Sequence, residues 1–116
     1  DRVEQLRKGT GSTTGGGTAD LVTIATSASQ AYVVKALIAG LKSTNDKSAS
    51  YELTAEFINT GALSIQGALT TLRLRTDTAL LVADILASGS NIIVRVTGTT
   101  GEDWNWTCQV SFAVVG

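Results

Sequence analysis

The clearest pattern in the chain is an alternation of apolar and polar residues near its C-terminus. The apolar positions are two residues apart, at Trp104, Trp106, Cys108, Val110, Phe112 and Val114, and the residues between them are polar as far as Ser111. Side chains of a β-strand point alternately to opposite faces, so this pattern predicts a strand with one face on a core. A second alternating run over 91–97, followed by turn residues at 98–101, predicts that 91–114 form a β-hairpin.

Shorter apolar runs separated by turn residues predict the other strands, over residues 21–26, 31–42, 51–57, 63–75 and 79–87. For 31–42 and 79–87 a helix is the competing interpretation. The intervening turns cover residues 27–30, 43–50, 59–61, 77–78 and 88–91, and Gly67 is a candidate β-bulge. The pattern therefore predicts an all-β fold, an antiparallel β-sandwich of jelly-roll-like type with about seven strands.

The run 31–42 is apolar on both faces of the predicted strand. One face carries Val34, Ala36 and Ile38, and the other carries Val33, Leu37, Ala39 and Leu41. A strand in a sandwich normally leaves one face in water. We therefore expect the second face to pack against another layer or another subunit, and we predict Val33, Leu37, Ala39 and Leu41 as an oligomer interface.

The run 72–75 alternates between leucine and arginine. We expect Leu72 and Leu74 to lie inward and Arg73 and Arg75 to lie outward. Two arginines spaced in this way are typical of a solvated strand face, and a ligand-binding role is the alternative.

The N-terminal residues differ in composition from the rest. Val3 and Leu6 have the spacing of heptad core positions, so residues 1–8 are interpreted either as a frayed terminus or as the end of a coiled-coil stalk. Residues 9–18 are only Gly, Ser and Thr, the composition of a flexible linker. The predicted organisation is therefore a possible stalk end (1–8), a linker (9–18) and a β-sandwich domain (19–116).

Composition excludes several classes of function. The chain has 116 residues and a net charge of −1, so no general attraction to nucleic acid or to an anionic membrane is implied. No apolar run is long enough for a membrane helix, so we expect no membrane insertion. Only 16% of the residues are charged while 43% are hydrophobic, which suggests more buried surface than one monomer's core requires.

The residues needed for catalysis or metal binding are scarce. The chain has no His, which removes the commonest general base and most zinc sites. The adjacent carboxylates Glu102 and Asp103 are poorly placed to share a substrate, and no pair faces a cleft as a glycosidase requires. We expect no enzymatic activity, no metal and no cofactor. Cys108 lies on the apolar face of its strand and is interpreted as a small buried hydrophobe rather than a reactive thiol.

Tryptophan can also form a platform for sugar rings. Trp104 and Trp106 are candidates for this role, and a free-standing carbohydrate-binding module would require Trp104 to be exposed. Both share the parity of Val110 and Phe112, so we expect them in the core.

The segment IIVRVTGTTGEDWNWTCQVSF, which follows ALLVADILASGSN, resembles a small β domain found at the ends of tailed-phage fibres and other virion surface proteins. The shared features are the turn 88–91, the strand 94–98 that ends in Val-Thr-Gly, Gly101, and Trp106 before the last strand. The upstream segment SYELTAEFINTGALSIQG is similar to the same pattern, which covers most of 19–115. The strongly apolar run 31–41 departs from it.

The resemblance implies a homotrimeric domain at the tip of a virion appendage that attaches to a glycan or protein of the host surface. A chain entering from a linker would place the turns 27–30, 59–61 and 88–91 at the end far from the stalk. We therefore predict Asn59, Thr60, Ser90 and Asn91 as receptor-contacting residues. The alternative is a structural module that decorates or assembles the capsid and binds no external ligand.

Overall fold

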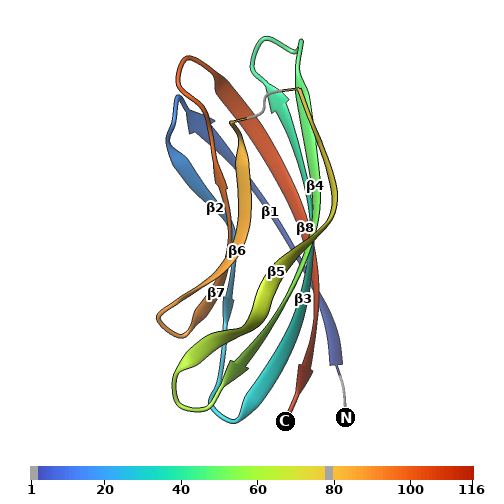
Figure 1. Cartoon of the computed structure of the whole chain (residues 1–116), viewed down its shortest axis with the longest axis vertical. Helices are drawn as coiled ribbons and strands as arrows, with labels where there is room; N and C mark the ends of the chain where they lie inside the picture. Colours follow the sequence, from blue (N-terminus) through green and yellow to red (C-terminus); the bar gives the residue numbers. More distant parts are fainter. Residues whose placement is uncertain (1–2, 78–79) are drawn as a thin grey trace.

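The computed structural model describes residues 3–77 and 80–116, with side chains from residue 5 onward. These residues form antiparallel strands packed in two layers (Figure 1), which confirms the all-β sandwich. The strands are β1 (Val3–Thr14), β2 (Thr18–Ala25), β3 (Gln30–Lys42), β4 (Ser48–Asn59), β5 (Leu63–Thr76), β6 (Val82–Ser88), β7 (Asn91–Thr97) and β8 (Asp103–Val115). The strand interpretation of 31–42 and 79–87 is confirmed for the described residues.

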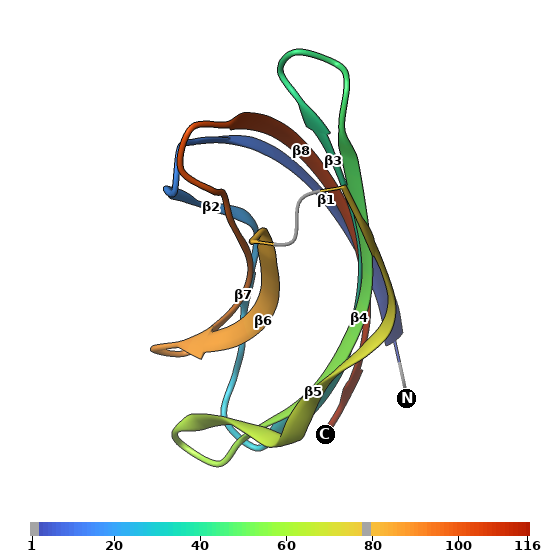
Figure 2. The same ribbon diagram turned by 45° about the horizontal axis from the view of Figure 1, so that its top comes forward.

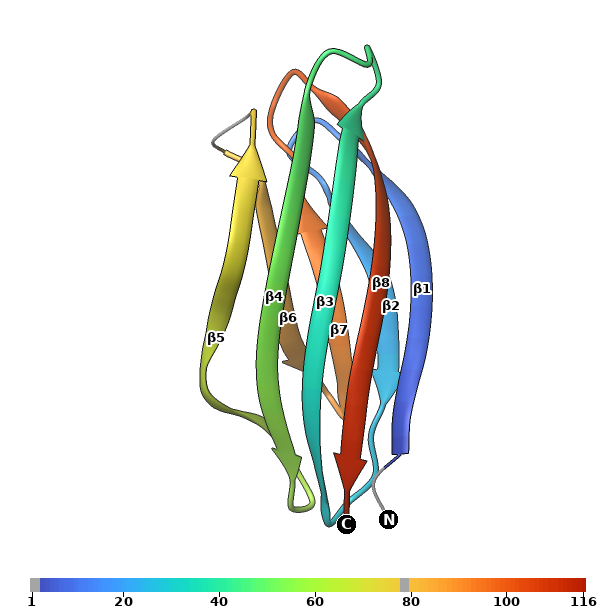
Figure 3. The same ribbon diagram turned by 90° about the vertical axis from the view of Figure 1, so that its right-hand side faces the viewer.

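The two layers differ in width. The larger sheet has the order β1-β8-β3-β4-β5 and the smaller has the order β2-β7-β6. Figure 3 looks onto the outer face of the larger sheet, with the smaller sheet behind it. The domain measures 45 × 22 × 22 Å, because the strands of the larger sheet run nearly parallel to its long axis.

The core lies between the layers and is built from the alternating positions seen in the sequence. Trp104, Trp106, Cys108, Val110 and Phe112 are all at most 3% exposed, which confirms the predicted inward face of β8. The two indole rings stack with their centroids 5.6 Å apart. Because the Trp104 ring is 1% exposed, a sugar platform at this position is excluded.

The prediction for residues 1–18 is wrong where the structure describes them. Residues 3–14 form β1, which pairs along its whole length with β8, from Val3 opposite Val114 to Thr14 opposite Asp103. The glycines that suggested a linker allow close packing instead. A Cβ at Gly9 would lie 1.7 Å from the carbonyl oxygen of Leu21, so β2 can cross β1 only where a side chain is missing.

The predicted hairpin over 91–114 is also wrong. Its two strands belong to different sheets: β7 pairs with β2 and β6, whereas β8 pairs with β1 and β3. Both strands present an apolar face because each faces the core from its own layer. The periodicity was correct, but it does not specify whether consecutive strands pair.

Strand β5 has the predicted bulge, but its leucine side chains are more exposed than inward-facing residues usually are. The bulge expected at Gly67 is present as a register shift opposite Ala55, and Gly67 has a φ of 74°. Leu74 lies opposite the buried Tyr51, as an inward residue should, yet it is 56% exposed, and Leu72 is 53% exposed. The inward orientation predicted from the alternation does not bury these leucines, because β5 is the edge strand of the wider sheet.

Candidate functional site

Three of the predicted turns meet at one end of the sandwich, near the bottom of Figure 1. The amide of Ser29 donates to the carbonyl of Asn59 at 2.6 Å, and the amide of Thr26 donates to the carbonyl of Ser90 at 3.0 Å. The turn 26–30 therefore joins the turns 59–61 and 88–91. We name this surface the turn end.

The turn end is not far from the point where the described chain begins. Figure 1 shows the start of β1 and the end of β8 at this same end. The predicted position opposite the entering chain is therefore wrong. The reason is β1 itself, since an additional strand before β2 reverses the end to which every later turn is assigned.

The predicted contact residues differ in how available they are. Asn59 is 4% exposed; its Nδ2 donates to Thr26 Oγ1 and its Oδ1 accepts from the Gly61 amide, both at 2.9 Å. This side chain therefore holds two turns together and is not free for a receptor. Thr60 and Ser90 are exposed, while Asn91 is half-buried where β7 begins. No observation connects these three to a ligand.

A polar groove opens beside the turn end, with a volume of about 610 Å³. Its walls come from both sheets, at the place where β1 and β2 separate (Figure 2). The residues that line it are Gln5, Arg7, Thr23, Ile24, Ala25, Ser27, Gln30, Tyr32, Phe112, Val114 and Gly116. We name it the terminal groove.

Arg7 is the charged residue of the terminal groove among the side chains that the structure describes. Its guanidinium carbon lies 5.3 Å from the centroid of the Phe112 ring, a cation–π contact. The guanidinium also donates to the Gln5 side-chain oxygen at 2.8 Å and to the Leu6 carbonyl at 3.1 Å. These contacts fix the orientation of the group, and two of its five N–H donors are thereby used.

Tyr32 forms the floor of the terminal groove on the β3 side. Its hydroxyl accepts from the Ser27 amide at 2.9 Å and donates to the side-chain oxygen of Gln30 at 2.6 Å. The ring is 3% exposed. The groove is therefore built on a buried, hydrogen-bonded tyrosine and does not depend on mobile surface side chains alone.

A second surface of interest is the outer face of β3, in the middle of the sheet in Figure 3. Val33, Leu37 and Leu41 are 46%, 55% and 44% exposed, and Ala39 is exposed as well. The same strand buries every alternate residue from Tyr32 to Gly40. The sequence therefore identified the sidedness of β3, and the apolar outer residues, which we name the β3 row, lie uncovered in the single chain.

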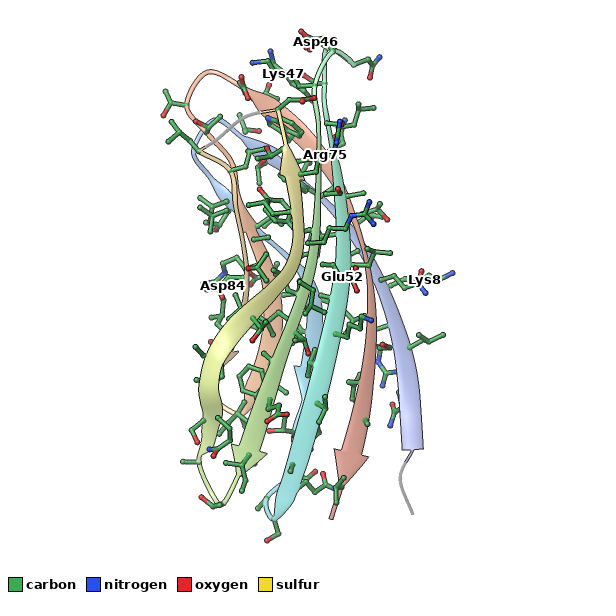
Figure 4. The ribbon with its side chains drawn as sticks, turned by 45° about the vertical axis from the view of Figure 1, so that its right-hand side comes forward. Lys8, Asp46, Lys47, Glu52, Arg75 and Asp84 are labelled. Carbon is green, nitrogen blue, oxygen red and sulfur yellow. The ribbon has the colours of Figure 1, made fainter. Side chains whose placement is uncertain are left out.

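The opposite end of the sandwich is tied together by polar contacts. Glu102 accepts from Lys47 Nζ at 3.1 Å and from the Trp104 indole at 3.0 Å, which joins the loop 98–102 to the loop between β3 and β4. Asp46 and Lys47 lie in that loop (Figure 4). A hydrogen bond from Thr44 lowers the pKa of Asp46 below its usual value. These side chains therefore bond to one another at this end of the sandwich.

Two further kinds of feature are absent from the described residues. Within 3–77 and 80–116, no group of three or more His, Cys, Asp or Glu side chains could hold a metal ion. In that same part of the chain, no helix is long and apolar enough to cross a membrane.

Comparison with known proteins identifies a shared fold and no family. No protein-family model and no curated protein matches the chain. Among solved structures, the chain is similar to part of the tailspike protein of Acinetobacter baumannii phage AM24, with a TM-score of 0.52 and 9% sequence identity over 95% of this chain. The chain spans 26% of that tailspike. At this identity the likeness concerns the fold alone.

The terminal groove was not predicted from the sequence. Its walls come from β1, β2, β3 and β8, so no local motif unites them. Gln5 and Arg7 alternate with Leu6 and Lys8, but eight residues of mixed polarity fit a frayed terminus equally well. The informative signal was the switch at residue 9 from large side chains to glycine, which marks where β2 begins to cross β1.

Proposed function

We propose that the chain is a non-enzymatic domain of a phage virion appendage that binds the host-cell surface. The observation that carries the proposal is the fold shared with part of a phage tailspike over 95% of this chain. The motif resemblance between 88 and 106 to appendage-tip domains supports the same class. The absence of His from the sequence fits a binding role better than a catalytic one. The domain would then lie on the outside of the virion.

The turn end with its terminal groove is the surface that we assign to host contact. It combines exposed hydroxyls at Thr60 and Ser90 with a groove fixed by Arg7 and Tyr32. Asn91, at the base of the 88–91 turn, remains a proposed contact, whereas Asn59 supports the turns from within. A surface glycan or protein of the host is the proposed partner.

We further propose that the domain acts as a homotrimer. The β3 row gives each copy an apolar surface that a second copy would cover, which removes Val33, Leu37, Ala39 and Leu41 from water. Three copies of one weak site gain affinity because the second and third contacts form at high effective concentration. Avidity is therefore the proposed mechanism of attachment.

Adsorption measured on intact particles tests the proposal. Virions carrying Thr60→Ala together with Ser90→Ala, or Arg7→Gln alone, should adsorb less to host cells while their thermal integrity stays unchanged. Lys8→Gln provides the matched control, because Lys8 projects from β1 away from the other strands (Figure 4). Intact adsorption combined with lost particle stability would instead support the capsid-decoration role.

A further inference from the structure

We infer that the terminal groove binds a saccharide that carries a carboxylate, with Arg7 as the anchor for the acidic group. The inference rests on the proposed function and names the class of ligand at the same surface.

The groove is open because of a change of residue size along the inner face of β1. Gly9 and Gly11 lie under β2, where added Cβ atoms would be 1.7 Å from the Leu21 carbonyl oxygen and 2.9 Å from a Leu21 methyl group. Gln5 and Arg7 continue the same face of β1 toward the turn end. Larger side chains therefore begin where β2 leaves β1, and they line the space between the two strands.

The hydrogen bonds made by Arg7, Tyr32 and the two glutamines use the glutamine oxygens and leave N–H donors unused. Arg7 can only donate, so the Gln5 oxygen accepts from it and the Gln5 amide NH₂ is left as a donor. The Tyr32 hydroxyl accepts a hydrogen bond from the Ser27 amide and donates one to the Gln30 side-chain oxygen. The Gln30 oxygen, like that of Gln5, is therefore already occupied as an acceptor. Two amide NH₂ groups and three N–H groups of Arg7 remain as donors.

A set of donors around one guanidinium selects an acceptor-rich anion. Arginine binds carboxylate through two parallel hydrogen bonds, and its contact with the Phe112 ring holds the plane of the guanidinium in place. The Gln5 and Gln30 amides suit ring and hydroxyl oxygens of a sugar. The volume of about 610 Å³ accommodates a short oligosaccharide. Nucleic acid is not favoured, because a net charge of −1 gives no general attraction to a long polyanion.

The test is a titration of the isotope-labelled chain followed by NMR at the Arg7 Nε–H and the glutamine side-chain amides. The probes are trigalacturonic acid and sialyllactose, with the methyl ester of trigalacturonic acid as the neutral match. We expect at least one acid to shift the Arg7, Gln5 and Gln30 signals. The methyl ester should bind at least roughly tenfold more weakly than the acid, since a hydrogen bond to a charged group is lost.

Two variants locate the effect. Arg7→Gln should weaken binding of the acid roughly tenfold or more, while Lys8→Gln, one residue away on the opposite face of β1, should leave the affinity within about twofold. Both positions are exposed, so we expect each variant to retain the folded state, which its NMR spectrum checks. Equal affinity for acid and ester, or equal loss in both variants, would overturn the inference. The absence of any shift in the groove with both acids at about 10 mM, a concentration that detects millimolar affinity, would overturn it as well.

The outcome is separable from that of the proposed function. If the wild-type chain binds host cells but the groove binds neither acid, attachment stands and the inference fails. If the groove binds an acid while particles carrying Arg7→Gln adsorb normally, the inference stands and attachment through this groove fails.

Discussion

The indole ring of Trp106 lies directly over the backbone of Gly40 in the neighbouring strand. The two residues are paired in the register of β3 and β8, and a Cβ at Gly40 would lie 2.5 Å from ring atom Cζ3. The ring is 3% exposed and stacks on Trp104, so it has no free space to move into. The glycine in this strand is therefore required for the packing of one of the two tryptophans of the core.

Replacement of Gly40 by alanine should destabilise the domain. The added methyl group overlaps a rigid buried ring, and overpacking of this kind costs about 1–3 kcal/mol. Urea denaturation followed by tryptophan fluorescence measures the free energy of unfolding. Thr10→Ala, an exposed position outside the β3 row, should change that free energy by less than about 0.5 kcal/mol. Equal stability of Gly40→Ala and wild type would contradict the observed packing.

Replacement of Gly9 by alanine tests whether residues 3–14 are a strand or a linker. The new Cβ would collide with the Leu21 carbonyl oxygen, a backbone atom that cannot turn aside, so we expect a loss of about 2–3 kcal/mol. Hydrogen exchange should show reduced protection of the β1 amides. The exposed neighbour Thr10→Ala serves as the control. A flexible linker would tolerate both changes without any effect on stability.

Asn59 is expected to matter for stability rather than for adhesion. Asn59→Ala removes its hydrogen bonds to Thr26 and to the Gly61 amide inside the turn end, so the free energy of unfolding should fall by about 1–2 kcal/mol. Thermal denaturation of this variant is compared with that of Thr60→Ala. Because Thr60 is exposed, its substitution should change the free energy of unfolding by less than about 0.5 kcal/mol. A stable Asn59→Ala domain with lost adhesion would restore Asn59 as a contact residue.

The buried thiol of Cys108 should make the domain less stable as the pH rises into the alkaline range. Burial raises the pKa of the Cys108 thiol from 9.0 to about 11. Between these values the unfolded chain has lost a proton that the folded chain retains, so the free energy of unfolding falls as pH rises, by up to about 1.4 kcal/mol per pH unit.

The measurement for Cys108 is urea denaturation of wild type and of Cys108→Ala from pH 8 to 11. The slope expected from Cys108 should be present in wild type and absent from the variant. Burial also raises the pKa of Tyr51, but that residue is present in both proteins and cancels in the difference. Identical slopes would show that the thiol ionises as freely in the folded state as in the unfolded state.

The sequence predicted those features that depend on alternation within one strand. The inward face of β8, the two-sided character of β3 and the bulge at Gly67 follow from local residue order. It did not predict β1, because glycine and threonine favour a linker by composition while the contact of Gly9 with Leu21 is formed across the sandwich. The sequence also could not assign β7 and β8 to different sheets, since an apolar face shows that a strand lies on the core but not which strand it pairs with.

The candidate site was predicted less well for the same reason. Counting strands correctly placed the turns 27–30, 59–61 and 88–91 at one end of the sandwich. It placed that end away from the entering chain, which is wrong because β1 was missing from the count. The terminal groove depends on four strands and on the register between Gln5 and Phe112. Such long-range relationships have no signature in a single sequence.

The oligomeric state tests the central claim most directly, namely that other copies of the chain cover the β3 row. Light scattering at tens of micromolar should give wild type the mass of three chains of 12.0 kDa, and Leu37→Glu the mass of one. Leu80→Glu is the matched control, because Leu80 is an exposed leucine, 73% exposed, outside the β3 row, and this variant should remain trimeric. A wild-type protein that scatters as a single chain at every concentration would contradict the account.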